Sequence, residues 1–474
     1  MAYQKPTRHL RERAVEKLGQ EEERNNIRRA VDRLAANKEK AASELGNWDD
    51  WRERGKEIRK HVVNNLDYYL KQLTENLIKN GAKVHFANEA KDASRITADI
   101  CQRHQAKMVV KSKSMVSEEI HLNDKLIEMG IEVVETDLAE YILQLADEAP
   151  SHIIVPSMHK NRYQIAQLFS KEAGETLSSD TPTLTAFSRK VLRKKFLTAD
   201  VGVTGCNFAI AETGSLALVT NEGNARMCNT YPKVHIAIMG MERIVPAFED
   251  FEALLTLLPR SATGQKITSY VSVINGPRKG DDLDGPDELH VIILDNGRSR
   301  MLADSEFRQA LHCIRCGACF NICPVYRQIG GHSYGSVYGG PIGSVITPLL
   351  EDDLDFWGEL PYASTLCAAC SSVCAVKIPL HDLLLKLRHR KVAAGHTPAM
   401  ERVTFRLWKN LFQKPGRYRL AMHSAAIFQK PLVRSGYIKI GPPPLSAWTN
   451  SRYFPAAAKK SFRQLWQEQS ENKR

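Results

Sequence analysis

Residues 312–326 read HCIRCGACFNICPVY and contain four cysteines at the spacing C-x2-C-x2-C-x3-C, followed by proline. In this motif the first three thiolates surround one iron-sulfur cube, and the fourth reaches the other cluster of a two-cluster ferredoxin. A structural zinc site would instead draw four ligands from paired knuckles, often with histidine. The spacing therefore indicates iron-sulfur ligation and predicts a small helical domain around this stretch.

A second, incomplete motif begins at Ser364, in the stretch STLCAACSSVCAVKIPL. Aligned from its C-terminal end, Cys374 is the fourth cysteine, Cys370 the third and Cys367 the second. Serine therefore stands where the first cysteine belongs. Ala375 stands where proline usually follows, which weakens the turn but leaves the thiols in place.

Exchange of the fourth ligand between the two motifs predicts two ligand sets. Cluster one takes Cys313, Cys316, Cys319 and Cys374; cluster two takes Cys323, Cys367 and Cys370, with a fourth position that is open or served by Ser364. We expect a 4Fe-4S cube for cluster one. Because a serine alkoxide is a harder ligand than a thiolate, we expect a 4Fe-4S or a 3Fe-4S form for cluster two. The alternative is that Ser364 only fills space and the second cluster is lost.

The clustering of the cysteines and the sequence of the N-terminus predict a reducing, cytoplasmic location. Seven of the ten cysteines fall between residues 313 and 374, and the N-terminus lacks an apolar stretch that could act as a secretion signal. Such clustering in a long chain indicates metal binding rather than disulfides. Cys101, Cys206 and Cys228 are expected to be ordinary buried residues.

Short β-branched runs begin further upstream and alternate with amphipathic stretches of helical length. The first four are KVHFA (83–87), KMVVKS (107–112), IEVVETD (131–137) and HIIVP (152–156), and four more follow: SLALVT (215–220), KVHIAIMG (233–240), TSYVSVI (268–274) and LHVIILDNG (289–297). Strands that alternate with helices at this interval indicate βαβ units. The sequence therefore predicts an α/β domain with a mainly parallel sheet.

These patterns divide the chain of 474 residues into four predicted parts. We expect a charged helical N-terminal arm over 1–61, the α/β domain over 62–300, the helical cluster domain over 301–400, and a basic, proline-containing tail over 401–474. The tail holds 15 basic and 3 acidic residues, so it accounts for the whole net charge of +12. A basic tail can dock on an acidic protein or make peripheral contact with an anionic membrane. No nucleic-acid recognition module and no transmembrane span are predicted.

Two polar stretches of the α/β domain are candidates for a binding site. Lys111, Ser112, Lys113 and Ser114 follow a predicted strand and precede a helix, where N–H groups and lysines can gather an anion. Glu212, Thr213 and Gly214 form a predicted tight turn before the next strand. The alternative for the first stretch is a charged loop with a serine cap. No glycine motif for a nicotinamide or flavin cofactor appears.

Several stretches together resemble one bacterial family. They are KSKSM, VVETDLAEYILQL, GVTGCNFAIAETGSLALVTNEGNARM, YPKVHIAIMGMERIVP, YGGPIGSVITPLL and VKIPL, in that order with the cysteine motifs. The chain is similar, from about residue 40 to 400, to the lactate utilisation iron-sulfur protein B family, LutB, also called YkgF. The resemblance implies a LUD domain, similar to the ribose-phosphate isomerase and CoA transferase-like fold, fused to an α-helical ferredoxin-like domain. Some relatives carry cysteine in place of Ser364 and proline in place of Ala375, so the resemblance leaves the type of cluster two open.

The resemblance also implies a function and partners. It implies an electron-transfer subunit that works with LutA-like and LutC-like proteins to oxidise L-lactate to pyruvate and passes electrons to an acceptor. It implies a subunit of an oxidoreductase complex rather than a complete enzyme, and it names no catalytic residue. Two alternatives stay open: an iron-sulfur subunit of another 2-hydroxy-acid oxidoreductase, or a LUD scaffold or binding module with structural clusters.

Overall fold

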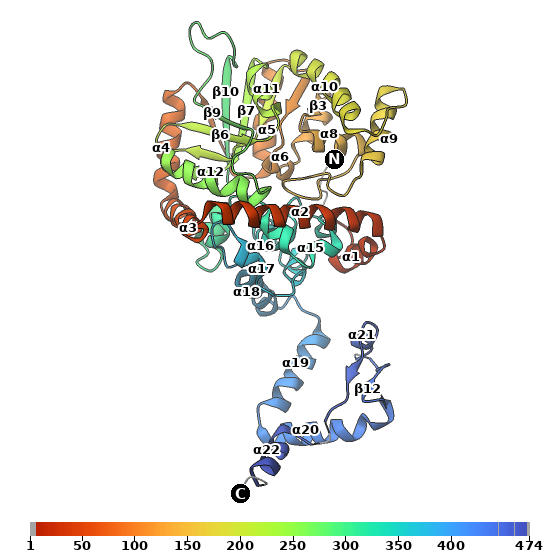
Figure 1. Cartoon of the computed structure of the whole chain (residues 1–474). Helices are drawn as coiled ribbons and strands as arrows, with labels where there is room; N and C mark the ends of the chain where they lie inside the picture. The colour runs from red at the N-terminus through yellow and green to blue at the C-terminus, as the bar shows by residue number, and fades with distance from the viewer. Residues whose placement is uncertain (1–5, 444, 459, 472–474) are drawn as a thin grey trace. The chain divides into compact units, whose positions relative to one another are not determined.

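The computed structural model describes residues 6–443, 445–458 and 460–471, which form two compact units divided between Ala394 and Gly395 (Figure 1). The predicted boundaries at residues 61 and 300 both fall inside the first unit, because the N-terminal helices and the cysteine region share one hydrophobic core with residues 208–217 and 245–258 of the α/β region. The second unit begins six residues before the predicted tail.

A six-stranded parallel sheet forms the centre of the first unit, in the order β1-β10-β7-β4-β2-β3. Its strands are β1 (Lys83–Ala87), β2 (Met108–Lys111), β3 (Glu132–Glu135), β4 (Val201–Thr204), β7 (Val234–Gly240) and β10 (Glu288–Leu294). The central strands β4 and β7 are buried along their whole length. Parallel strands covered on both faces are expected to be almost continuously apolar. In β4 and β7 the polar exceptions are Thr204 and His235, whose side chains hydrogen-bond each other at 2.8 Å.

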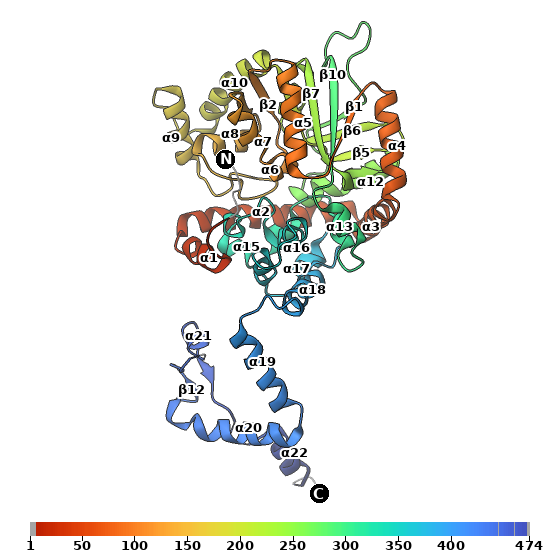
Figure 2. The same cartoon turned by 180° about the vertical axis from the view of Figure 1, so that it is seen from behind.

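Helices and a second sheet cover the two faces of the parallel sheet (Figure 2). One face packs on α5 (Ala90–Arg103), α6 (Met115–Glu119) and α7 (Leu122–Glu128). The other face packs on α4 (Leu66–Lys79) and on a four-stranded sheet in the order β8-β5-β6-β9. This sheet consists of β5 (Phe208–Ile210), β6 (Ser215–Thr220), β8 (Ile244–Val245) and β9 (Tyr270–Ile274). Helices α8 (Leu138–Ala146), α9 (Arg162–Ala173) and α10 (Thr181–Thr198) pack beside β2 and β3, and α11 (Asn224–Thr230) follows β6.

The N-terminal helices lie between the sheet region and the cysteine region. They are α1 (Leu10–Leu18), α2 (Glu21–Leu45) and α3 (Trp48–Asn64). Ile27, Val31 and Leu34, spaced by one helical turn, form a buried stripe on α2. This stripe packs on α12 (Phe248–Ala262) from the sheet region and on α14 (Ala318–Ile322) and α15 (Tyr326–Ile329) from the cysteine region. Figures 1 and 2 both show α2 along this boundary, so it holds the two regions together.

Short helices make up the cysteine region. They are α13 (Arg298–Ala303), η2 (Arg308–His312), α14, α15, η3 (His332–Tyr334), α16 (Gly340–Leu350), η4 (Trp357–Tyr362), α17 (Ala369–Val373) and α18 (Leu380–Ala393). The second unit contains α19 (Ala399–Phe412), α20 (Pro415–Phe428), η5 (Lys430–Leu432), α21 (Ser446–Thr449), α22 (Phe462–Glu471) and a small antiparallel sheet of β11 (Val433–Arg434), β12 (Tyr437–Ile438) and β13 (Phe454–Pro455). Within the described residues, every helix is too short or too polar to cross a bilayer.

One predicted strand is wrong. HIIVP (152–156) is an irregular loop, because the His152 ring nitrogen Nδ1 accepts hydrogen bonds from the backbone N–H of Ile154 (3.0 Å) and Val155 (3.2 Å). A side chain that binds neighbouring N–H groups competes with a sheet ladder for the same donors. The loop packs instead on the cysteine region, where the His152 ring contacts Phe320 and Tyr326.

Candidate iron-sulfur centre

The two cysteine motifs follow the same backbone course. Arg315 (φ 59°) and Gly317 (φ 73°) have left-handed conformations before α14, and Leu366 (φ 54°) and Ala368 (φ 62°) have them at the corresponding places before α17. Alternating right- and left-handed residues bring successive N–H groups to one side, which makes the concave turns typical of iron-sulfur sites. The second motif therefore keeps the local fold of the first although one cysteine is absent.

Ser364 occupies the place that Cys313 has in the first motif. Cys313 Sγ accepts a hydrogen bond from the N–H of Arg315 at 3.4 Å, and Ser364 Oγ accepts one from the N–H of Leu366 at 3.1 Å. Both acceptors use the N–H two residues further along the chain. Ser364 and Cys313 thus make the same local hydrogen bond, which agrees with an alignment that puts Ser364 in the first position of the second motif.

Four cysteines line one cavity in the cysteine region. Its sulfur-bearing residues are Cys313, Cys316, Cys319 and Cys374, and its other walls are mainly apolar: Ile153, Ile314, Ile342, Val376, Ile378 and Leu380. Cys374 comes from the second motif, so the cavity combines three cysteines of one motif with the last cysteine of the other. This is the set that ligand exchange predicts for cluster one.

The other three cysteines lie near one another beside this cavity. Helices α14 and α17 pack together. Burial, together with the nearby Cys323 and Cys367, raises the pKa of Cys370 to about 11. Cys323 Sγ accepts a hydrogen bond from the N–H of Tyr326 at 3.5 Å. Cys367 is exposed, whereas Cys323 and Cys370 are buried. These three residues could hold a second cluster that is open on one side.

The protonation of the buried cysteines fits a site built for a metal group. Burial raises the pKa of Cys316 to about 12 and that of Cys374 to about 11, and it raises the pKa of Cys319 as well. Several thiols that cannot ionise alone become thiolates when a thiophilic cation displaces their protons. The donor set, all sulfur and largely shielded from water, fits iron-sulfur clusters.

Three cations, of which Lys38 and Arg59 are buried, lie near the cysteines of the first cavity. Lys38 on α2 lies near Cys316 and Cys374, and burial lowers its pKa while thiolate charge at these cysteines would oppose that shift. Arg52 on α3 donates from Nε to the carbonyl of Cys374 at 2.9 Å. Arg59, also on α3, is 1% exposed and lies near Cys313. These cations would offset the negative charge of a thiolate-ligated cluster.

A buried ion-pair network joins the sheet region to the first motif. Arg298 makes two bonds of 2.8 Å to the Glu119 carboxylate and one of 2.7 Å to Glu242. Tyr338 donates to Glu119 Oε2 at 2.6 Å, and the guanidinium of Arg315 lies over the Tyr338 ring at 4.5 Å. The sequence motifs did not predict this network, and its one local signal is Arg315, inside the first C-x2-C step.

Lys111 lies at the carboxyl end of β2 and is fully buried. Its ammonium pairs with Glu118 Oε1 at 2.5 Å and with Glu135 Oε1 at 2.7 Å. Glu140 lies close by, and burial raises its pKa well above the ordinary value, with the charges of Glu135 and Asp137 adding to the effect. Lys111 therefore already has two carboxylate partners, a role that the sequence did not suggest.

The rest of the KSKS stretch bonds to β4, to α6 and to the loop at 152–156. The N–H of Ser112 donates to the carbonyl of Val203 on β4, and Ser114 caps α6 by accepting from Ser117 N. Lys113 Nζ donates to the carbonyl of Ile154 at 2.6 Å. A side chain at Gly317, in the first cysteine motif, would come within 3.0 Å of Ile154. Ile154, in the loop at 152–156, thus lies between Lys113 and Gly317 of the first cysteine motif.

The turn of Glu212, Thr213 and Gly214 lies against α4. Asn76 Nδ2 donates to the carbonyl of Glu212 at 2.9 Å, and Asn80 Nδ2 donates to that of Thr213 at 2.8 Å. Gly214 has φ +65°, and a Cβ there would lie 2.6 Å from the Asn76 backbone. Among the hydrogen bonds and ion pairs of the described residues, none joins this turn to Lys111–Ser114. The two predicted stretches are held by different elements.

Comparisons with known proteins match the same parts of the chain. The LUD domain matches residues 70–294, the 4Fe-4S dicluster domain residues 309–378, and the domain described as lactate utilisation protein B, C-terminal, residues 387–471. A solved structure of a DUF162 family protein from Deinococcus radiodurans covers 48% of this chain and 98% of its own, at 16% identity and a TM-score of 0.28.

These matches define the class as a LUD-domain protein with a 4Fe-4S dicluster domain. Lactate utilization protein B of Bacillus licheniformis is 50% identical, over 100% of this chain and 99% of its own length. The protein of the same name from Bacillus thuringiensis is 51% identical over 94% of each chain. The chain belongs to the lactate utilization protein B family.

Proposed function

We propose that the chain is the iron-sulfur electron-transfer subunit of a multi-protein system that oxidises L-lactate to pyruvate, in the cytoplasm. The family membership supports a role in lactate use, and the two adjoining groups of cysteines carry the proposal for electron transfer. When bound, two clusters would carry electrons one at a time, which suits an organic donor that gives up two. The parallel sheet with its accompanying second sheet supports a fold of the ribose-phosphate isomerase and CoA transferase-like type.

We assign the cysteines as exchange of the fourth ligand predicts. Cluster one, a 4Fe-4S cube, uses Cys313, Cys316, Cys319 and Cys374; cluster two uses Cys323, Cys367 and Cys370, with Ser364 at the fourth position. The common cavity supports the first set, and the shared backbone course of the two motifs supports the place of Ser364. Three thiolates support either a 4Fe-4S or a 3Fe-4S form for cluster two.

The ligand assignment is tested by two matched variants. Cys374→Ala in the second motif should remove cluster one, whereas Cys323→Ala in the first motif should remove cluster two. Iron and sulfide analysis with electron paramagnetic resonance of anaerobic protein distinguishes the two losses. If each variant instead lost the cluster of its own motif, the exchange of ligands would be refuted.

In this proposal, residues of the chain hold the iron-sulfur clusters in place and do not themselves react with substrate. Lys38, Arg52 and Arg59 place positive charge around the first cavity, and α2 keeps the cysteine region fixed against the sheet. For the anion site proposed at residues 111–114 and 212–214, Lys113 is the strongest member. Its ammonium is only partly buried and binds a carbonyl, whereas Lys111 is neutralised by two glutamates.

The function is tested by reduction of the clusters with substrate. L-lactate should bleach the visible absorption of the anaerobic protein only when the LutA-like and LutC-like proteins of the same organism are present. Glycolate in place of L-lactate tests another 2-hydroxy acid as substrate. Clusters that stay oxidised with L-lactate and both partners, yet are reduced by dithionite, would exclude the electron-transfer role in lactate oxidation.

The fourth position of cluster two has its own test. Ser364→Cys should convert cluster two to a stable all-cysteine 4Fe-4S cube without change in cluster one. The electron paramagnetic resonance signal of the oxidised natural protein should then differ from that of the variant. Identical spectra and iron content in the two proteins would show that residue 364 does not lie at a cluster.

A further inference from the structure

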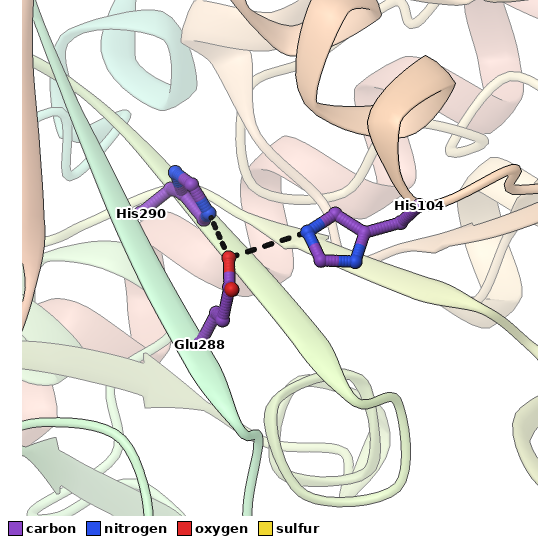
Figure 3. Close-up of side chains that lie close together, drawn as sticks. All are labelled: His104, Glu288 and His290. Carbon is purple, nitrogen blue, oxygen red and sulfur yellow. Dashed lines mark hydrogen bonds and ion pairs between the residues drawn. The ribbon is translucent and has the colours of Figure 1, made fainter.

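A second group of metal-binding side chains lies away from the cysteines, at the beginning of β10. Glu288 and His290 are the first and third residues of that strand, and His104 is the C-cap residue directly after α5. Glu288 Oε2 lies 3.2 Å from His104 Nε2 and 2.9 Å from His290 Nε2 (Figure 3). The three ligand atoms all lie within 4.8 Å of one another.

This geometry fits one metal ion of the first transition row. Zinc binds imidazole nitrogen and carboxylate oxygen at about 2.0–2.2 Å, so two ligands of one tetrahedral ion are about 3.4 Å apart. The distances of 3.2 Å and 2.9 Å to Glu288 Oε2 are shorter than that value by about 0.2 and 0.5 Å, so small side-chain shifts would admit an ion. Two histidines and one glutamate are also a donor set that zinc uses where its fourth position stays open.

A further histidine orients the buried ligand. His85 Nε2 on β1 lies 3.0 Å from His290 Nδ1, and the two rings are stacked with centroids 5.3 Å apart. With an ion bound, a hydrogen bond from His290 Nδ1–H to His85 Nε2 would leave the His290 Nε2 lone pair free to bind that ion. Metal-bound histidines characteristically donate their second ring N–H to such a partner, which fixes the tautomer.

Lys83 is the competitor for the site. Its ammonium lies 2.8 Å from Glu288 Oε2, and its side chain is 52% exposed. A surface ion pair of this kind contributes little to stability, and the flexible lysine can move into solvent. Removal of the lysine charge should therefore favour a bound cation.

We propose that His104, Glu288 and His290 bind one divalent transition-metal ion, with zinc the favoured ion and the fourth position open to solvent. The ion fastens the end of α5 to the start of β10. His85 acts as a positioning residue through His290. The site is independent of the cysteines and of the role in lactate oxidation.

The test uses the anaerobic holoprotein, washed with a chelator and titrated with zinc sulfate. Isothermal titration calorimetry should show one site per chain, and the zinc X-ray absorption edge should show nitrogen and oxygen neighbours without sulfur. His104→Ala and Glu288→Gln should each weaken binding at least tenfold, and His85→Ala about tenfold. Lys83→Met should strengthen binding, and His423→Ala, at an exposed position of the second unit, should leave it unchanged.

Other results would overturn the proposal. Zinc affinity unchanged in both His104→Ala and Glu288→Gln would show that the ion binds elsewhere. Sulfur neighbours at the zinc edge would assign it to cysteines. His104 is exposed, so its replacement does not depend on the refolding of a buried strand.

Discussion

Replacing Arg59 with methionine is expected to destabilise the first unit by about 3–5 kcal/mol. The Arg59 guanidinium donates to four backbone carbonyls, those of Glu242, Ile244, Leu311 and His312. Two of these carbonyls belong to the sheet region and two lead into the first cysteine motif. Arg59 thus joins α3 to both regions from a fully enclosed position.

The magnitude follows from what the substitution leaves behind. Methionine fills much of the volume but donates no hydrogen bond, so up to four buried carbonyls lose a charged donor. Each buried group left without a partner costs about 1–3 kcal/mol, and removal of the unfavourable burial of the guanidinium offsets part of that sum. Unfolding entropy of about 2 cal/mol/K per residue, over residues 1–394, converts 3–5 kcal/mol into a fall of about 4–6 °C in Tm.

Thermal unfolding of the anaerobic holoprotein, followed by loss of visible cluster absorption, measures this change. Arg54→Met is the matched control, because Arg54 lies on the same helix and makes an exposed ion pair of 2.8 Å with Asp250. Such pairs contribute about 0–1 kcal/mol, so the control should lower Tm by about 1 °C or less. Equal Tm values for the two variants would refute the reasoning that the buried carbonyls depend on Arg59.

Three further predictions concern the sheet edge and the tail. Lys111→Met should destabilise the protein by about 3–5 kcal/mol because it leaves Glu118 and Glu135 buried without their cation. Lys113→Met should instead lower lactate-dependent turnover and leave Tm unchanged. A lower Tm for Lys113→Met together with an unchanged Tm for Lys111→Met would contradict both roles. Because the pKa of Glu140 is raised in the folded state, its ionisation destabilises the fold as pH rises above about 4.5. In urea unfolding, Glu140→Gln should therefore become more stable relative to the natural protein between pH 5 and pH 8. A difference in unfolding free energy that does not change with pH would contradict the raised pKa. Deletion of residues 401–474, which carry the whole net charge, should abolish co-sedimentation with anionic vesicles at low salt, and an equal amount of sedimented protein with and without the tail would exclude that contact.

The sequence predicted those features that depend on neighbouring residues. The β-branched run at 233–240 became a parallel strand, since a buried strand needs little beyond its own apolar side chains. The run at 83–87 also became a parallel strand, at the edge of the sheet. The two cysteine motifs form turns of similar backbone course, as their spacing predicts, and the backbone around Ser364 follows the first motif. The loop at 152–156 was mistaken for a strand because a single histidine redirects its N–H groups.

Features that depend on distant residues could not be predicted from local patterns. Lys111 looked available to a ligand, but its partner Glu135 lies on another strand. His104 and His290 come from separate elements, and no motif links them in the sequence. The charged residues of α2 suggested an exposed helix, although Ile27 and its neighbours are buried by segments formed much later in the chain.

The position of the N-terminal helices has a consequence for the order of folding during synthesis. Arg13 binds the carbonyl of Ser333, 320 residues further along, and the N–H of Leu10 binds Glu359, 349 residues further along. At about 5–20 residues per second, a ribosome needs roughly 15–60 s to make this intervening chain. Throughout that time the apolar stripe of α2 has no cysteine region to cover it. The first helices to be made are thus among the last to reach their native contacts, and the growing chain is most exposed to aggregation or chaperone binding at its N-terminus.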